Sequence, residues 1–337
     1  MPFPEYRSRR SRHKPGLRRM LAETHLGPQD IICPLYVTDG EGVREESRWL
    51  PGVFRYSVDQ LREPVEELSA LGVGAVLLYG IPRKRDELAR DAVRVDNVVC
   101  RALRRIREVD AKLVMISDVG VSAYTSHGHG GVLRKARGKA GKVLDGAEVD
   151  NDATLELLAE MAVTHARCGV DFVSPSASMD GQVGFIRETL DEEDFDGVGV
   201  MACSVRYRSS YAQVSNPAVD GPDDVDRAAY QVDPANVHDA LREVELDIAE
   251  GADMVGVKPA LAYLDVIYRL RELTHLPIVG FSGSGEYQSL KAAAEKGWVD
   301  GERAMLENLL AIKRAGAEAI VTFHGIEAAR TLARQRG

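Results

Sequence analysis

A lysine ends one of the most apolar stretches of the chain. Lys258 follows Met-Val-Gly-Val within residues 254–260 and is followed by Pro-Ala. A buried strand does not need a cation at its end, so we expect the amine to face a cleft. There a neutral lysine can attack a carbonyl carbon and form an imine. The alternative is an ordinary surface lysine, because exposed lysines are the norm.

Other reactive or polar side chains stand at the ends of similar apolar stretches. They are Tyr79, Asp118, Ser174, Ser176, Cys203, Arg206, Ser282, Ser284, Phe323 and His324. We interpret Asp118 as the group that orients the substrate or accepts a proton. Its alternative role is to bind nearby loop amides. Arg206 could lower the proton affinity of Lys258 or hold a substrate carboxylate through two hydrogen bonds.

Buried strands are needed to position these residues. Eight apolar stretches rich in β-branched residues occur at residues 31–37, 73–79, 113–119, 170–174, 198–203, 252–258, 277–281 and 317–323. Helical patterns, with apolar residues three and four positions apart, lie between most of them. Examples are residues 58–71, 152–168, 234–250, 263–273 and 303–315.

Glycine separates several of these helical patterns from the next strand. Gly72, Gly169, Gly251 and Gly316 occupy this place, where glycine ends a helix in the left-handed conformation at little cost. Repeated units of this kind favour an α/β fold, a TIM (β/α)8 barrel over residues 31–337 after an N-terminal extended arm over residues 1–30. A doubly wound open sheet is the alternative. In a barrel, the carboxyl ends of the strands carry the site.

Composition and charge limit the location and partners of the chain. It has 337 residues, 45% of them hydrophobic and 6% aromatic, and a net charge of -9, which argues against nucleic-acid binding. The start is nevertheless basic, with Arg7, Arg9, Arg10, Arg12, Lys14, Arg18 and Arg19. It lacks the apolar stretch of a signal peptide, and no later run matches the roughly 18 apolar residues of a membrane span. We expect a cytoplasmic protein that has no membrane partner.

The four cysteines are widely spaced. Cys33, Cys100, Cys168 and Cys203 form no CxxC pair, so we expect reduced, packed thiols. Cys203 is the one that could reach a pocket. Two long connections, at residues 124–146 and 207–229, have the length of lids, whereas residues 83–95 suggest a solvated connection.

Six motifs together resemble the porphobilinogen synthase family, also called the 5-aminolevulinate dehydratase family. They are Tyr-Thr-Ser-His-Gly-His at 124–129, Glu-Val-Asp-Asn-Asp-Ala at 148–153, Met-Asp-Gly at 179–181, Tyr-Gln-Val-Asp-Pro-Ala-Asn at 230–236, Val-Lys-Pro-Ala at 257–260 and Ser-Gly-Glu-Tyr at 284–287. The resemblance extends from about residue 17 to residue 317. It implies a TIM barrel whose basic N-terminal arm embraces a neighbouring subunit, and so a homo-oligomer of two to eight chains.

The resemblance also implies two lysines, each holding one molecule of 5-aminolevulinate as an imine. One matches Lys258. The other belongs in a Ser-Ala-Lys-Tyr motif that reads Ser-Val-Arg-Tyr at residues 204–207. Arg206 cannot replace that lysine, because its guanidinium stays protonated and has no lone pair for a carbonyl carbon.

The metal site of the family is changed as well. Gly120, Ser122 and Gly130 stand where zinc-dependent members place three cysteines, and glycine offers no ligand. His127 and His129 remain but point apart in an extended segment. We therefore expect metal-independent imine chemistry without zinc or another cofactor. Magnesium stays possible at Glu286, which matches an allosteric ligand in some relatives, although a glutamate is stabilised in the first turn of a helix anyway.

Some substrate contacts implied by the resemblance are replaced. Ala177 stands in place of an aspartate, Phe323 in place of a tyrosine and Asn216 in place of an arginine. The positions expected to contact a small ketoacid substrate are Ser176, Arg227, Gln231, Ser282, Ser284 and Phe323.

Three functions remain open from the sequence. The first is a lyase that condenses or dehydrates an aminolevulinate-like ketoacid through Lys258 alone without making porphobilinogen. The second is a working 5-aminolevulinate dehydratase with a single imine-forming lysine. The third is a catalytically silent homologue with a binding role.

Overall fold

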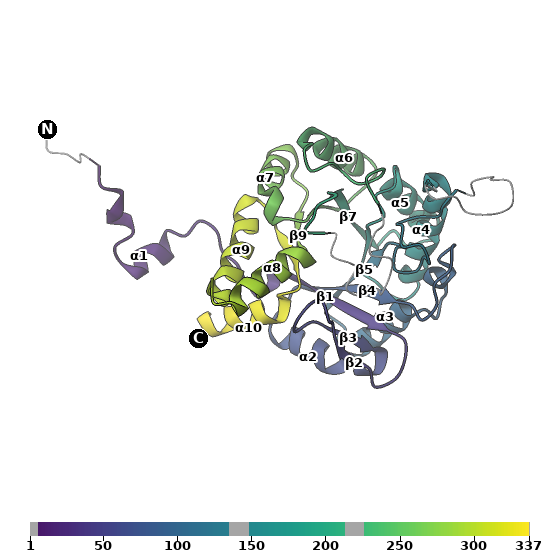
Figure 1. The fold of residues 1–337 in the computed structure, drawn as a ribbon, viewed down its shortest axis with the longest axis horizontal. Coiled ribbons are helices and arrows are strands. Elements are labelled where there is room, and N and C mark those ends of the chain that lie inside the picture. Colours follow the sequence, from purple (N-terminus) through teal and green to yellow (C-terminus); the bar gives the residue numbers. More distant parts are fainter. Residues whose placement is uncertain (1–5, 135–147, 213–225, 337) are drawn as a thin grey trace.

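Eight parallel strands close into a barrel in the computed structural model, which describes residues 6–134, 148–212 and 226–336. The strands are β1 (Ile31–Thr38), β4 (Ala75–Ile81), β5 (Val114–Val119), β6 (Phe172–Pro175), β7 (Gly199–Arg206), β8 (Met254–Lys258), β9 (Ile278–Ser282) and β10 (Ala319–Thr322). Each pairs in parallel with the next, and Ile31 of β1 pairs with Ile320 of β10. This last pairing closes the ring seen in Figure 1. The predicted TIM barrel is confirmed, and the open sheet is excluded.

Helices surround the strands (Figure 1). They are α2 (Arg62–Ala70), α3 (Val98–Val109), α4 (Asn151–Ala166), α5 (Gln182–Glu192), α6 (Val237–Ala249), α7 (Leu264–Leu273), α8 (Ser284–Glu295), α9 (Gly301–Ala315) and α10 (Gly325–Arg336). All five predicted helical stretches overlap one of them, although α4 and α9 begin one and two residues earlier than predicted, and residues 58–60 and 261–263 are short 3-10 turns. Gly72, Gly169, Gly251 and Gly316 have φ values of 73°, 85°, 99° and 125°, as their proposed role requires.

A short hairpin is added to the barrel beside β1. It consists of β2 (Arg44–Glu46) and β3 (Phe54–Ser57), and β3 pairs in parallel with the end of β1. Neither strand is among the eight predicted from the sequence. β2 is wholly charged and exposed, so it lacks the alternation of apolar and polar residues that marks a strand.

The barrel interior is filled by apolar side chains that alternate with those facing the helices. They are Ile32, Ala75, Leu77, Ile116, Met201, Cys203, Val279, Phe281 and Val321. Cys203 is 2% exposed and packs in this interior, so the structure does not support its expected access to a pocket. All four cysteines are buried and free, as predicted.

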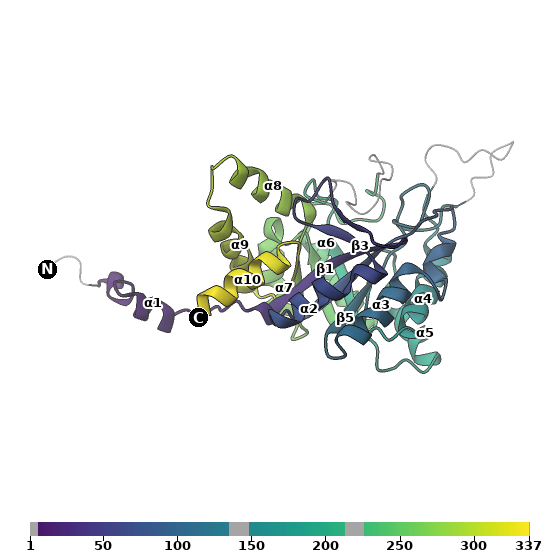
Figure 2. The same ribbon diagram turned by 90° about the horizontal axis from the view of Figure 1, so that it is seen from below.

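The segment before β1 leaves the barrel. Figure 2 shows α1 (Pro15–Met20) standing well apart from it, with Met20 71% exposed. Two 3-10 turns, Ser8–Ser11 and Pro28–Asp30, lie on either side. Across the parts of the chain that the structure describes, no helix is both long and apolar enough to cross a membrane.

Packing of α3 against the barrel gives a test of the fold. Asn97 begins the helix by accepting a hydrogen bond from the Cys100 amide (2.9 Å), and Leu103 is fully buried on its inner face. We predict that Leu103→Ala lowers the free energy of unfolding by about 2–5 kcal/mol, because it leaves a cavity. Leu246→Ala on α6, where the leucine is 50% exposed, should cost about 1 kcal/mol or less. Urea unfolding checks both, and equal losses would contradict this packing.

Candidate functional site

Lys258 is the last residue of β8 and lies at the carboxyl end of the barrel. Its Nζ is 5.9 Å from the centre of the Tyr79 ring and 5.6 Å from that of Phe281. Both rings belong to strands of the barrel, so the amine faces the interior and is not an ordinary surface lysine. Burial, and then the nearby Arg206 guanidinium, lower the pKa of Lys258 below its usual value, while Cys203 and Asp118 oppose this shift.

Arg206 is brought beside Lys258 by an irregularity in β7. The pairing of β7 with β8 shifts between Ala202 and Val205, after which Arg206 stands directly opposite Lys258. Its guanidinium donates a hydrogen bond to the backbone carbonyl of Ser176 at the end of β6. The cation is therefore held in place on the side of the mouth next to the amine.

Asp118 comes from β5 and completes this group. Its Oδ1 accepts a hydrogen bond from the Ser176 hydroxyl (2.7 Å). Burial raises the pKa of Asp118, although Ser176, Lys258 and Arg206 oppose the rise. The structure thus brings together all three predicted catalytic residues, Lys258, Arg206 and Asp118, with Ser176 between Asp118 and Arg206. Within the described residues, the hydrogen bond that Asp118 accepts comes from a side chain and not from a loop amide, which was its alternative partner.

A cavity of about 1210 Å³ opens beside Arg206 and is also lined by Gln231. Arg227 lies close by and donates a hydrogen bond to the carbonyl of Gly128 (3.0 Å). Burial lowers the pKa of Arg227, and the cation of Arg206 acts in the same direction. These positions suit the binding of an anionic group. Asn216, the replacement for an arginine, lies outside the described residues, as do residues 135–147 and 213–225 of the two expected lids.

The remaining predicted contacts lie on β9, α8 and the end of β10. Ser282 is buried at the end of β9, and Ser284 begins α8 two residues later. Phe323 stacks on Tyr36 with ring centres 6.0 Å apart and lines a separate cavity of about 480 Å³. A row of rings extends from Phe323 through Tyr36 to Tyr79 beside the amine, since the ring centres of Tyr36 and Tyr79 are 5.6 Å apart.

The donor set for zinc does not fit this site. A β-carbon on Gly120 would come within 2.4 Å of the Ser176 hydroxyl, so even a small side chain there displaces a residue of the site. The expectation that His127 and His129 point apart is wrong, because their ring centres are 5.7 Å apart and both line the cavity. Burial lowers the pKa of both. Within the described ranges no group of three or more His, Cys, Asp or Glu could hold a metal ion.

Glu286 has a structural task at the start of α8. Its carboxylate accepts hydrogen bonds from the backbone amides of Gly283 and Leu261 and so joins α8 to the connection after β8. Burial raises the pKa of Glu286 to about 7. These hydrogen bonds agree with a structural role of Glu286 in the first turn of α8, which was the alternative to magnesium binding. Magnesium binding at Glu286 stays a prediction.

Two tyrosines of the site were not found from the sequence. Tyr36 belongs to the row of rings described above. Tyr230 lies over the His-Gly-His segment, with its hydroxyl 3.4 Å from His129 Nδ1 and 3.4 Å from the Gly130 amide. Tyr230 opens the motif at residues 230–236, and this was the one sequence signal that could have suggested a role.

Comparisons with known proteins find similar sequences over nearly the whole chain. A family model described as delta-aminolevulinic acid dehydratase matches residues 5–331. Proteins named delta-aminolevulinic acid dehydratase are 44% identical to the chain in Synechococcus elongatus and 42% identical in Streptomyces coelicolor. Each match covers 98% of this chain, and it covers 100% and 98% of those proteins.

A solved structure is similar over nearly the whole chain. It is delta-aminolevulinic acid dehydratase (porphobilinogen synthase) from Toxoplasma gondii in complex with the reaction product porphobilinogen. The TM-score is 0.90 and the identity 36%, with 97% of this chain and 91% of that chain covered.

The pairing of Arg206 with Lys258 predicts a pH effect. A neighbouring cation disfavours the ammonium form, so Arg206→Gln should raise the pKa of Lys258 and leave less neutral amine at a given pH. The rate of reductive methylation of Lys258 by formaldehyde and cyanoborohydride, followed by mass spectrometry, should move about one unit to higher pH. Arg208→Gln is the matched control, since Arg208 pairs with Asp226 at 3.9 Å. An unmoved profile in Arg206→Gln would refute the coupling.

Proposed function

Because the chain belongs to the delta-aminolevulinic acid dehydratase family, we propose that it is a lyase that binds 5-aminolevulinate, or a closely similar ketoacid, as an imine on Lys258. The family that the six motifs indicated is thus confirmed. The observation that carries the proposal is the position of Lys258, desolvated at a strand end and directly opposite Arg206. Both effects increase the share of neutral amine, which is the form that attacks a carbonyl carbon.

The first step forms the imine. The Lys258 nitrogen attacks the ketone carbon, a C–N bond forms, and the carbonyl oxygen leaves as water. The protonated imine then accepts the electron pair released when the adjacent carbon loses a proton. Asp118 is the proposed acceptor of that proton, because its carboxylate is fixed by Ser176 and its pKa is raised by burial.

Arg206 and its neighbours bind the rest of the substrate. A guanidinium can hold a carboxylate through two parallel hydrogen bonds, and the cavity beside Arg206 leaves room for one. Arg227 and Gln231 extend this polar wall. Ser282 and Ser284 are proposed to contact the end of the substrate nearest Lys258. No step runs through a metal ion, since the zinc positions do not carry its donors.

The candidate functions differ in whether porphobilinogen is the product. The named relatives are dehydratases, and one similar structure contains porphobilinogen, which favours porphobilinogen formation here. In that case Lys258 would hold one substrate as an imine, and Arg206 would hold the second through its carboxylate. The comparisons thus favour this function over the expectation that porphobilinogen is not made. That expectation depends on Arg206, which cannot form a second imine.

Borohydride trapping tests whether Lys258 forms an imine, which both candidate functions require. After incubation with 5-aminolevulinate and borohydride, we expect a stable adduct on Lys258, located by peptide mass spectrometry. Lys258→Ala should abolish the adduct. Lys291→Ala should not, because the Lys291 ammonium is paired with the Glu327 carboxylate at 2.7 Å. A colour test for pyrrole on matched incubations without borohydride shows whether porphobilinogen is the product. No adduct on Lys258 with 5-aminolevulinate or other small ketoacids would refute the function.

The role of Asp118 gives a separate test. Asp118→Asn keeps the shape of the side chain but removes the proton acceptor, so turnover should fall by about 10²- to 10⁴-fold. Borohydride trapping on Lys258 should persist, because imine formation does not use this carboxylate. Ser176→Ala should have a smaller effect, since it only loosens Asp118. Full turnover in Asp118→Asn would show that the carboxylate has only a structural role.

A further inference from the structure

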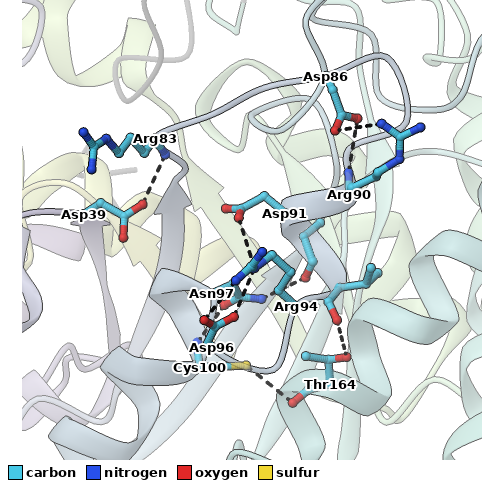
Figure 3. A network of polar contacts seen from close by, with 12 residues as sticks. Asp39, Arg83, Asp86, Arg90, Asp91, Arg94, Asp96, Asn97, Cys100 and Thr164 are labelled. Atoms are coloured by element: carbon cyan, nitrogen blue, oxygen red, sulfur yellow. Dashed lines mark hydrogen bonds and ion pairs between the residues drawn. The ribbon is translucent and has the colours of Figure 1, made fainter.

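Two cysteines that are far apart in the sequence meet outside the barrel. Cys100 lies on α3 and is fully buried, and Cys168 follows the end of α4 and is 6% exposed. The Cys100 sulfur lies 3.5 Å from the carbonyl oxygen of Thr164, one helical turn before Cys168 (Figure 3). Cys100 and Cys168 are close enough that each thiol affects the ionisation of the other.

An arginine lies beside one of the two sulfurs. Arg104 is one turn after Cys100 on α3, and its Nη2 is 3.2 Å from the Cys168 sulfur. The hydrogen bond from Cys100, followed by the cation of Arg104, lowers the pKa of the Cys168 thiol below its usual value. Thiolates react with oxidants much faster than thiols do, and a cation beside a cysteine stabilises the thiolate. Arg104 itself is exposed, so this end of the pair is close to solvent.

We propose that Cys100 and Cys168 form a redox-reversible modification site, in which hydrogen peroxide links them by a disulfide and Cys168 reacts first. The Cys168 thiolate attacks one peroxide oxygen, the O–O bond breaks, and a sulfenic acid and hydroxide form. The Cys100 thiol then attacks the Cys168 sulfur. The S–S bond forms as the S–O bond breaks, and the hydroxide that leaves takes the Cys100 proton. Two thiols are oxidised, and one peroxide is reduced to two waters.

The other two cysteines lack this arrangement. Burial raises the pKa of both Cys33 and Cys203, and in the described part of the chain neither lies against another cysteine. Oxidation should therefore be selective. The disulfide would fasten α3 to the end of α4 on the outside of the barrel, behind β5, which carries Asp118. The site does not depend on the proposed function and can be tested without any substrate.

Mass spectrometry tests the site directly. The folded protein is treated with hydrogen peroxide, free thiols are then alkylated in denaturant, and the chain is cut with trypsin without reduction. We expect residues 95–101 linked to residues 168–187, and dithiothreitol should release them. Cys33 and Cys203 should remain alkylated. A Cys168 that stays alkylated, or a link between any other pair, would overturn the proposal.

Variants separate the two steps and the role of the arginine. In Cys100→Ser, Cys168 should stop at the sulfenic acid, which dimedone traps. Arg104→Gln should slow disulfide formation about fivefold, because less Cys168 is ionised. Arg105→Gln is the matched control on the same helix, since Arg105 binds Glu108 at 2.9 Å and not a thiol. Equal rates in Arg104→Gln and Arg105→Gln, or no dimedone adduct on Cys168, would refute the assigned order.

Discussion

The site depends on two cations being held at the ends of neighbouring strands. The β7–β8 pairing sets Arg206 opposite Lys258, and burial of the Lys258 amine weakens the screening of its charge by solvent. Two positive charges in such a place raise the free energy of the doubly protonated state. Arginine keeps its proton under all ordinary conditions, so the cost falls on the lysine. Arg206 itself cannot form an imine, but its charge favours the neutral, nucleophilic form of Lys258.

Strand order explains how the other polar groups reach this pair. β5, β6, β7 and β8 are consecutive neighbours, and they end in Asp118, the Ser176 segment, Arg206 and Lys258. Ser176 connects them, because its hydroxyl binds Asp118 and its carbonyl binds Arg206. A change at any one of these residues therefore alters the electrostatic setting of the next. The opposite part of the mouth carries the aromatic rings of Tyr36, Tyr79, Phe281 and Phe323.

Membership of the family and the details of the site inform different questions. Identity above 40% over the full length fixes the fold and the class of enzyme. It does not determine which groups occupy the mouth, because a few substitutions there hardly change an overall identity. The replacement at residue 206 and the glycines at the zinc positions are changes of this kind. They bear on the product and on the need for a metal, and neither follows from the fold.

The sequence alone predicted the barrel, which the structure confirms, and three residues of a catalytic centre, which stay a prediction. Eight apolar stretches, most of them separated by helical patterns and several preceded by a glycine, favour eight repeated βα units. The carboxyl ends of the strands in such units meet at one face of the barrel, so Lys258, Asp118 and Arg206 could be assigned to one site. The charged strand β2 and the ring of Tyr36 could not be predicted. Their roles come from neighbours distant in the chain and not from a local pattern.

The contacts between neighbouring βα units follow from the folded arrangement and could not be predicted from the sequence. Nothing in the spacing of Ser176 and Arg206 shows that a carbonyl of one receives the guanidinium of the other, because that contact depends on the irregular pairing of β7. The meeting of Cys100 and Cys168 likewise depends on how α3 packs beside α4. Local sequence fixes the periodicity of each element. The register and packing that bring distant side chains together depend on the closure of the whole barrel.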